Sequence, residues 1–219
     1  MTVPEPLRLA AGEVGVWWAH SRPRSAELLA LLDPIESTRH SALRRAGDRD
    51  RFASAHVLTR VVLAGLLSRY VDEVSIRATC KFCGSVGHGK PELYDTDPRF
   101  TFSLAYAGAR VGVAVARVPV GLDVAVLDLD HPLETTLAVT RTEAWLKATG
   151  DGLTIPLSEI EVPEEDVQLA DLSPGAGHIA ALALLTAAAI DPDENLPYTV
   201  TEFDGEPLLA AAAEPPSIA

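Results

Sequence analysis

The segment 118-VPVGLDVAVLDLDH-131 predicts a strand that carries a carboxylate. Valine and leucine dominate the run, as expected of a strand, and Asp123 stands within it just past Gly121. A carboxylate in an apolar run is costly unless it is paired or used. Because alternate residues of a strand share a face, Asp123 and Ala125 point the same way. The strand therefore offers one acidic side chain where a two-carboxylate site would have two.

The runs on either side of this strand predict a chain of mixed helices and strands. A glycine at 108 predicts a hairpin between residues 100–107 and 109–118, and residues 13–20 predict a first strand. Helices are expected over 25–33, 36–47, 48–70 and 132–148, with residues 79–93 as a loop. The composition of residues 177–190 fits either a helix or a buried strand. A seam is expected near Pro119, and the two parts have a similar order of elements.

Length and charge exclude several classes of protein. A chain of 219 residues that is 47% hydrophobic can bury a substantial core, as one large domain or two small ones. No apolar run reaches the roughly 20 residues of a membrane span, and no secretory signal is recognisable. We therefore expect a cytoplasmic monomer with no membrane partner. A net charge of −13 argues against nucleic-acid binding.

The basic residues are concentrated in one part of the chain. Residues 39–69 are rich in arginine, whereas residues 151–214 contain no lysine or arginine. Arg49 and Arg51 fall in the first turn of the long helix 48–70, where cations oppose the helix dipole. An anionic ligand at this helix end would resolve the conflict. A helix start that is merely solvated is the alternative interpretation.

A second group of chemically reactive side chains lies in the loop 79–93. Cys80, Cys83 and His88 supply three potential metal ligands, one fewer than a closed zinc site needs. Two cysteines cannot form a disulfide framework. We interpret them as ordinary loop cysteines.

Five segments occur in a characteristic order, and with them the chain resembles the surfactin-type 4′-phosphopantetheinyl transferase family from about Arg39 to Leu185. The segments are DRDRFASAHVLTRVVLAGLL (48–67), HGKPEL (88–93), FTFSLAYAGARVGVAVA (100–116), VGLDVAV (120–126) and TRTEAWLKATGDGLTIPLSEIEV (140–162). The segment ADLSPGAGHIAALAL (170–184) is similar to the closing strand of the family, so 177–190 is predicted to be a strand.

The resemblance implies a fold and an activity. The fold would be α+β, with two pseudo-symmetric halves (residues 1–118 and 119–219), each a small, mostly antiparallel sheet packed on a helix. Coenzyme A would lie in the cleft between the halves. The activity would be transfer of phosphopantetheine from coenzyme A to a serine of an acyl or peptidyl carrier protein.

The resemblance also implies roles for individual residues. Asp123 and Glu143 would hold Mg²⁺, with Glu143 as base and Lys147 as a cation at the transferring phosphate. The coenzyme A site would include Arg49, Arg51, Lys90, Pro91 and Tyr106. Arg39 and Arg44 are weaker candidates for the same role. A strand tyrosine whose hydroxyl is simply satisfied is the alternative for Tyr106.

The chain departs from the family pattern at the metal and phosphate positions. Ala125 replaces a carboxylate, Ala105 and Tyr106 replace a serine–histidine pair, and Thr142 replaces a lysine. Asp128 and Asp130 are interpreted as turn or helix-cap residues rather than substitute ligands. These departures predict a weakened magnesium site and impaired transfer. A non-catalytic homologue that binds coenzyme A or a carrier protein is the alternative hypothesis.

Overall fold

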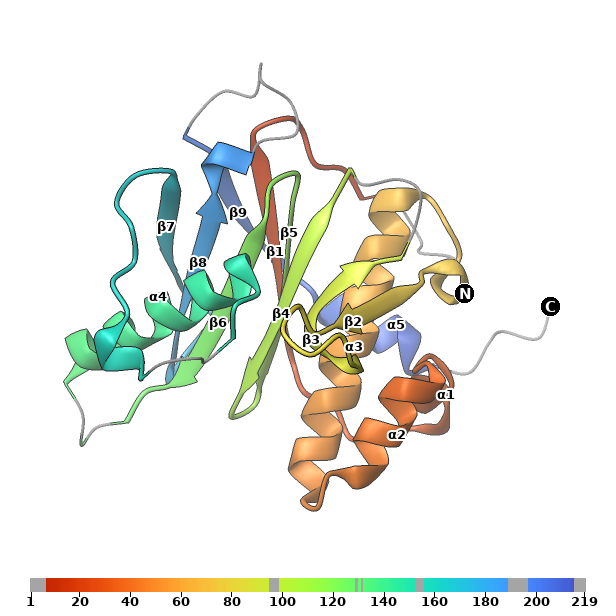
Figure 1. Cartoon of the computed structure of the whole chain (residues 1–219). Helices are drawn as coiled ribbons and strands as arrows, with labels where there is room; N and C mark the ends of the chain where they lie inside the picture. Colours follow the sequence, from red (N-terminus) through yellow and green to blue (C-terminus); the bar gives the residue numbers. More distant parts are fainter. Residues whose placement is uncertain are drawn as a thin grey trace.

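The computed structural model describes residues 7–94, 99–128, 130, 132–152, 156–188 and 197–214. Within them the chain is α+β, with five helices and three small, mostly antiparallel sheets (Figure 1). None of these helices is both long and apolar enough to cross a membrane. The elements are β1 (Glu13–His20), α1 (Ala26–Ala30), α2 (Pro34–Ala42), α3 (Ala46–Leu67), β2 (Ile76–Thr79), β3 (Val86–Leu93), β4 (Thr101–Ala107), β5 (Arg110–Ala116), β6 (Val120–Val126), α4 (Leu133–Thr149), β7 (Val167–Leu172), β8 (His178–Leu185), β9 (Thr199–Asp204) and α5 (Glu206–Ala212).

The largest sheet has the order β4-β5-β1-β9 and packs against α3. Every residue of α3 from Phe52 to Leu67 is buried, so the helix is covered on all sides. Strand β9 pairs in parallel with β1, and Leu209 of α5 is fully buried in the core around α3. The last strand and helix of the described chain therefore return to the first sheet.

A second sheet, β6-β8-β7, places its two faces against different partners. Val120, Leu122 and Val124 pack with β1 and β5 residues in a core between the two larger sheets. The opposite face packs against α4 through alanines at positions 144, 148, 181 and 183. A Cβ on Gly121 would lie 1.8 Å from the Ala144 carbonyl oxygen. The glycine thus permits the close contact between β6 and α4.

The third sheet is the two-stranded hairpin β2-β3, in the segment expected to be a loop. That expectation is wrong for residues 86–93, which form a strand. The pairing jumps between neighbouring residues of β2: Ala78 pairs with Pro91, whereas Thr79 pairs with Val86. Residues 87–90 therefore bulge out of the ladder, and the two glycines of the bulge have positive φ angles of 97° and 103°. Glycine normally weakens a strand, but the two glycines of β3 are accommodated because they lie in the bulge.

Most of the other expected elements are confirmed. The hairpin at Gly108 joins β4 to β5, and α4 ends at Gly150 in the left-handed conformation. Residues 178–185 form a strand, and residues 189 and 190 of the predicted run lie outside the described residues. The expected end of the second helix at Gly47 is wrong, because α2 ends at Ala42 and Gly47 belongs to α3.

Candidate functional site

The two carboxylates predicted to share a metal lie side by side. Asp123 is a buried residue of β6, and Glu143 is a half-buried residue of α4. Burial, and then the charge of Asp123 and a hydrogen bond with it, raise the pKa of Glu143. Such an effect requires close proximity of the two groups. Gly121 sets the spacing between β6 and α4. It lies on the same face of β6 as Asp123 and lets the strand approach the backbone of α4.

Lys147 completes this cluster. Its Nζ lies 2.6 Å from Oδ1 of Asp123, and it follows Glu143 by one helical turn. The side chain of Asp123 is 9% exposed and that of Lys147 is 38% exposed. Lys147 therefore lies at the edge of a cavity, whereas Asp123 is buried beside it and does not line that cavity.

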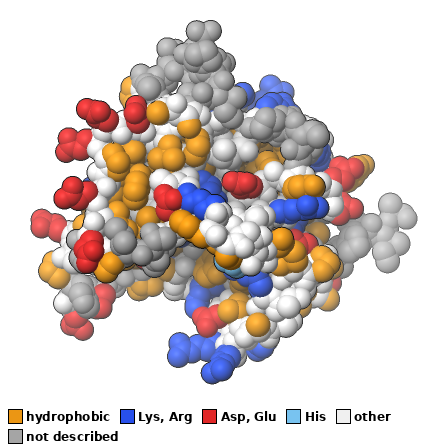
Figure 2. All heavy atoms as spheres, in the orientation of Figure 1, with side chains coloured by type: hydrophobic (Ala, Val, Ile, Leu, Met, Phe, Trp, Pro, Cys, Tyr) orange, Lys and Arg blue, Asp and Glu red, His pale blue; other side chains and the backbone are white. Residues whose placement is uncertain are grey.

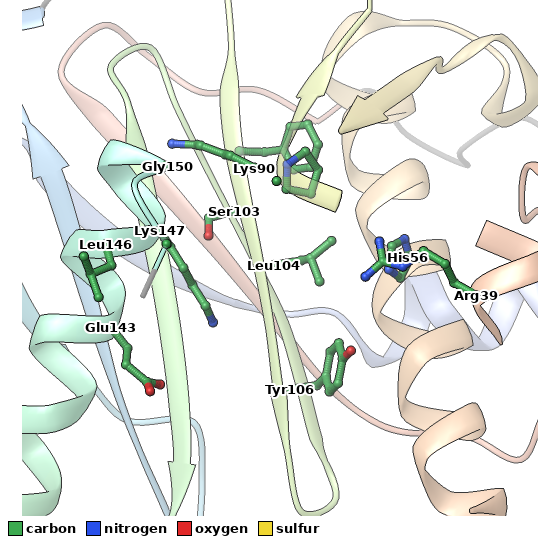
Figure 3. A pocket seen from close by; sticks show the side chains of 14 residues that line it. Arg39, His56, Lys90, Ser103, Leu104, Tyr106, Glu143, Leu146, Lys147 and Gly150 are labelled. Carbon is green, nitrogen blue, oxygen red and sulfur yellow. The ribbon is translucent and has the colours of Figure 1, made fainter. Parts of the chain in front are cut away.

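That cavity has a volume of about 450 Å³ and is lined by residues from five elements. Glu143 and Lys147 of α4 stand on one side, Leu104 and Tyr106 of β4 line the middle, and His56 lies across from them (Figure 3). The full lining is Arg39, His56, Gly89, Lys90, Pro91, Phe102, Ser103, Leu104, Tyr106, Glu143, Leu146, Lys147, Gly150 and Gly152. Its size is typical of a small-molecule site.

His56 was not predicted from the sequence, yet it is held firmly at the cavity wall. It stacks on Phe52 with ring centroids 4.0 Å apart, and its Nδ1 lies 2.9 Å from Oε1 of Glu36. Arg60 donates to the other oxygen of Glu36 at 2.8 Å. Burial alone would raise the pKa of Glu36, but His56 and Arg60 bring it down to about 2. Glu36 is thus an anion that orients His56.

Arg39 adds a guanidinium group to the same wall. Its guanidinium lies 5.5 Å from the ring centroid of Phe52, the ring on which His56 stacks. Arg39 is also among the residues that line the cavity. The cavity therefore has basic side chains at two separated places, Arg39 with His56 and Lys147 near the carboxylates.

Lys90 and Pro91 line the cavity as the sequence predicts, but the ammonium of Lys90 is already engaged. Its Nζ donates to the carbonyl oxygens of Val120 (3.0 Å) and Ala148 (2.7 Å). Burial lowers the pKa of Lys90 to about 8. An ammonium has three donors, so one N–H remains for a ligand. The two hydrogen bonds of Lys90 join β3 to β6 and α4.

The remaining residues predicted to contact phosphate differ in whether they line the cavity. Tyr106 lines the cavity, and burial raises the pKa of its phenol. Arg51 donates to the carbonyl of Gly108 at 3.1 Å and pairs with Asp48, and it does not line the cavity. Arg49 does not line it either. The helix begins at Ala46 with Arg45 as N-cap, two residues earlier than predicted, so Arg51 lies beyond its first turn and the expectation for this residue is wrong.

The other positions considered for metal ligands add no carboxylate to the cluster. Ala125 shares the face of Asp123 but brings no oxygen, so β6 supplies one carboxylate. Asp128 accepts a hydrogen bond from the backbone N–H of Asp130 at 3.0 Å, which is the behaviour of a turn residue. This agrees with the interpretation made from the sequence.

No sequence pattern marks His56, because a histidine inside an apolar helix is not distinguished by its neighbours. Its partner Glu36 lies in α2, and Arg60 lies one turn further along α3. Only the folded chain shows that the three buried side chains Glu36, His56 and Arg60 lie together.

Charge is distributed over the surface as the sequence predicts. Acidic side chains gather on the side of the molecule formed by α4 and β7, whereas basic side chains gather at the lower end, where α2 leads into α3 (Figure 2). Comparison of the chain with models of known protein families gave no match, and a search of curated proteins gave none either. Function is therefore inferred from the residues of the chain itself.

Proposed function

We propose that the chain binds coenzyme A and transfers its phosphopantetheine arm to a serine of a carrier protein, at a reduced rate. The observation that carries this proposal is the grouping of Asp123, Glu143 and Lys147: Glu143 and Lys147 line the cavity, and the buried Asp123 is paired with Lys147. These three residues come from two of the five segments that resemble the transferase family, VGLDVAV and TRTEAWLKATG.

The cavity suits a long, multiply charged ligand. Coenzyme A carries phosphates at both ends of its nucleotide, and basic groups stand at separate points of the cavity: Arg39 and His56 on one wall, Lys147 on the other. Between them the lining is largely apolar, with the partly buried Leu104 available to a base or a pantetheine chain. In this proposal the cavity is the ligand cleft between two pseudo-symmetric halves.

Magnesium fits the residues that are present. Two adjacent carboxylates, one of them with a raised pKa, form an unfavourable like-charge pair that a divalent cation would relieve. Mg²⁺ accepts one or two protein carboxylates and fills its other positions with water and phosphate oxygens. Asp123 and Glu143 would hold it, and it would supply neutralisation of charge on the pyrophosphate.

The chain's own residues account for the proton and the charge. Glu143 has a raised pKa, so as a carboxylate it is a better base than an ordinary glutamate, and it would accept the proton of the attacking serine. The serine oxygen would bond to the phosphorus of the phosphopantetheine group as the bond to 3′,5′-ADP breaks. Lys147 would stabilise the negative charge on the transferring phosphoryl group.

The reduced rate follows from Ala125. The chain lacks the second carboxylate on the Asp123 face, and the ammonium of Lys147 already neutralises part of the remaining charge. Both effects lower the affinity of the site for Mg²⁺. Binding of coenzyme A depends on other parts of the cavity and would persist.

The test combines a binding and a turnover measurement. The chain is incubated with MgCl₂, coenzyme A and several apo carrier proteins, and the carriers are weighed by mass spectrometry. We expect a gain of one phosphopantetheine group with the wild type and with Glu134→Gln, an exposed change on the same helix as the site, and no gain with Asp123→Asn or Glu143→Gln.

Calorimetry with coenzyme A alone separates the outcomes. Binding without any mass gain, even at high enzyme concentration, would replace the proposal by a non-catalytic coenzyme A-binding role. Absence of binding would overturn both.

A further inference from the structure

The tip of the β2-β3 hairpin brings together three side chains that the proposed function does not use. The ligand atoms of Cys80, Cys83 and His88 all lie within 4.8 Å of one another. Sγ of Cys83 is 3.3 Å from Nε2 of His88. Both thiols are free, and Cys83 and His88 are exposed to solvent.

We propose that Cys80, Cys83 and His88 bind one Zn²⁺, with the fourth position taken by water. Tetrahedral zinc with Zn–S bonds of about 2.3 Å and Zn–N bonds of about 2.0 Å separates its ligand atoms by about 3.5 to 3.8 Å. No pair of the three ligand atoms is therefore more than about 1.3 Å beyond the required spacing. This inference does not depend on the proposed transferase activity.

The backbone of the hairpin brings together two ligands from its connecting turn and one from β3. The N–H of Gly84 donates to the Cys80 carbonyl at 2.8 Å, and the N–H of Cys80 donates to the Ser85 carbonyl at 3.0 Å. These bonds close a tight turn with the two cysteines at its ends. His88 enters from the bulge 87–90 of β3. A Cβ at Gly89 would lie 2.6 Å from the Thr79 carbonyl oxygen, so the bulge needs a glycine beside the histidine.

The type of ligand decides the metal. Two thiolates and an imidazole favour Zn²⁺ over Mg²⁺ or Ca²⁺, which prefer oxygen. Iron–sulfur clusters are held by four cysteines, or by two cysteines and two histidines in Rieske centres, whereas this site offers two cysteines and one histidine. The cysteines bind as thiolates, so zinc binding releases their thiol protons to the solvent.

The zinc would stiffen a wall of the cavity. Lys81, inside the turn, donates to the Thr149 carbonyl at 3.1 Å and pairs with Asp151. Lys90, in the bulge, donates to the Ala148 carbonyl. The turn and the bulge are thus both attached to the C-terminal end of α4, and Gly89 to Pro91 line the cavity. A metal that ties the turn to the bulge would fix the position of this wall.

The experiment uses the full chain, purified in the presence of a phosphine reductant. Bound metal is measured by elemental mass spectrometry, and affinity is measured by Zn²⁺ titration against a chromophoric chelator. We expect about one Zn²⁺ per chain for the wild type and for His20→Asn, a change of a solvent-exposed histidine away from the hairpin. Cys83→Ser and His88→Asn, both at exposed positions, should lose stoichiometric zinc while their circular dichroism stays unchanged.

Two further readouts identify the site without any activity measurement. Co²⁺ in place of Zn²⁺ should give the visible absorption of a tetrahedral thiolate complex in the wild type only. Removal of zinc with a chelator should speed amide hydrogen exchange in residues 76–93 of the wild type and leave Cys83→Ser unaffected. Wild-type zinc binding no tighter than that of Cys83→Ser, or a Cys80–Cys83 disulfide that survives the reductant, would overturn the inference.

Discussion

Replacing Gly121 by alanine should destabilise the fold and separate the two carboxylates. The added Cβ would lie 1.8 Å from the Ala144 carbonyl oxygen and 2.4 Å from the Ala148 backbone nitrogen. Both neighbours are backbone atoms of α4, so no side-chain rotation can relieve the contact. To restore a separation of 3.0 Å from the Ala144 oxygen, the helix must withdraw by about 1.2 Å.

The size of the effect follows from the packing around the contact. Ala144 and Ala148 are buried against β6 and β8, so a shift of α4 opens gaps along the whole alanine-lined interface. Overpacking of this kind costs about 1 to 3 kcal/mol, and a contact with helix backbone belongs at the upper end. For a chain of this length, about 3 kcal/mol corresponds to a fall of roughly 6 to 12 °C in Tm.

The assay is urea unfolding followed by circular dichroism, with Gly47→Ala as control. Gly47 lies in α3, and its nearest neighbour to an added Cβ is the Arg51 guanidinium at 3.7 Å. The control should gain about 0.5 kcal/mol from the better helix propensity of alanine. A free energy of unfolding for Gly121→Ala within about 0.5 kcal/mol of the wild type would refute the close approach of β6 and α4.

Three more predictions concern charged groups. Glu36→Gln should lower the free energy of unfolding by about 3 kcal/mol at pH 7, because the folded pKa of Glu36, about 2, lies far below the ordinary 4.5. The difference from wild type, measured by urea unfolding, should vanish as pH falls through this interval. A difference that does not change with pH would contradict the prediction. Glu143 has a raised pKa, so its ionisation costs stability. The free energy of unfolding of Glu143→Gln, relative to that of the wild type, should therefore increase as pH rises from about 4 to 7, and MgCl₂ should reduce that increase. Ala125→Glu adds a carboxylate to the Asp123 face and should strengthen Mg²⁺ binding by about tenfold in calorimetry, whereas Val126→Glu on the other face should not. Equal affinities for the two variants would show that the Asp123 face is not the metal face.

The sequence predicted best where one local pattern decides the structure. The run 120–126 alternates between a core face and a face toward α4, and Gly150 ends α4, as its conformational freedom suggests. The proximity of Asp123 and Glu143 was also expected, but through the family resemblance. Local pattern alone could not supply it, because it depends on the packing of a helix against a strand 20 residues away.

The parts that escaped prediction depend on long-range pairing. Strand β9 pairs with β1 across more than 180 residues, and nothing in the acidic final third indicates that partner. Strand β3 was hidden by its glycines, which look like loop residues until the bulge is known. The helix α3 was expected to begin at Asp48, yet it begins at Ala46, and Asp48, in its first turn, pairs with Arg51. The N-cap residue, Arg45, makes no side-chain cap hydrogen bond.

The carboxylate cluster and the cysteine cluster depend on one strand, β3. His88 faces the cysteines of the turn, and Lys90, two residues later, is hydrogen-bonded to the backbone of both β6 and α4. Those two elements carry Asp123 and Glu143, so the bulge of β3 joins the tip of the hairpin to the frame of the carboxylate pair. Because the Lys90 ammonium is buried, losing its carbonyl partners would leave an uncompensated charge, which makes the connection stiff. We therefore expect a disturbance at the hairpin tip to reach the helix that positions Glu143 and Lys147, through the hydrogen bonds of Lys90.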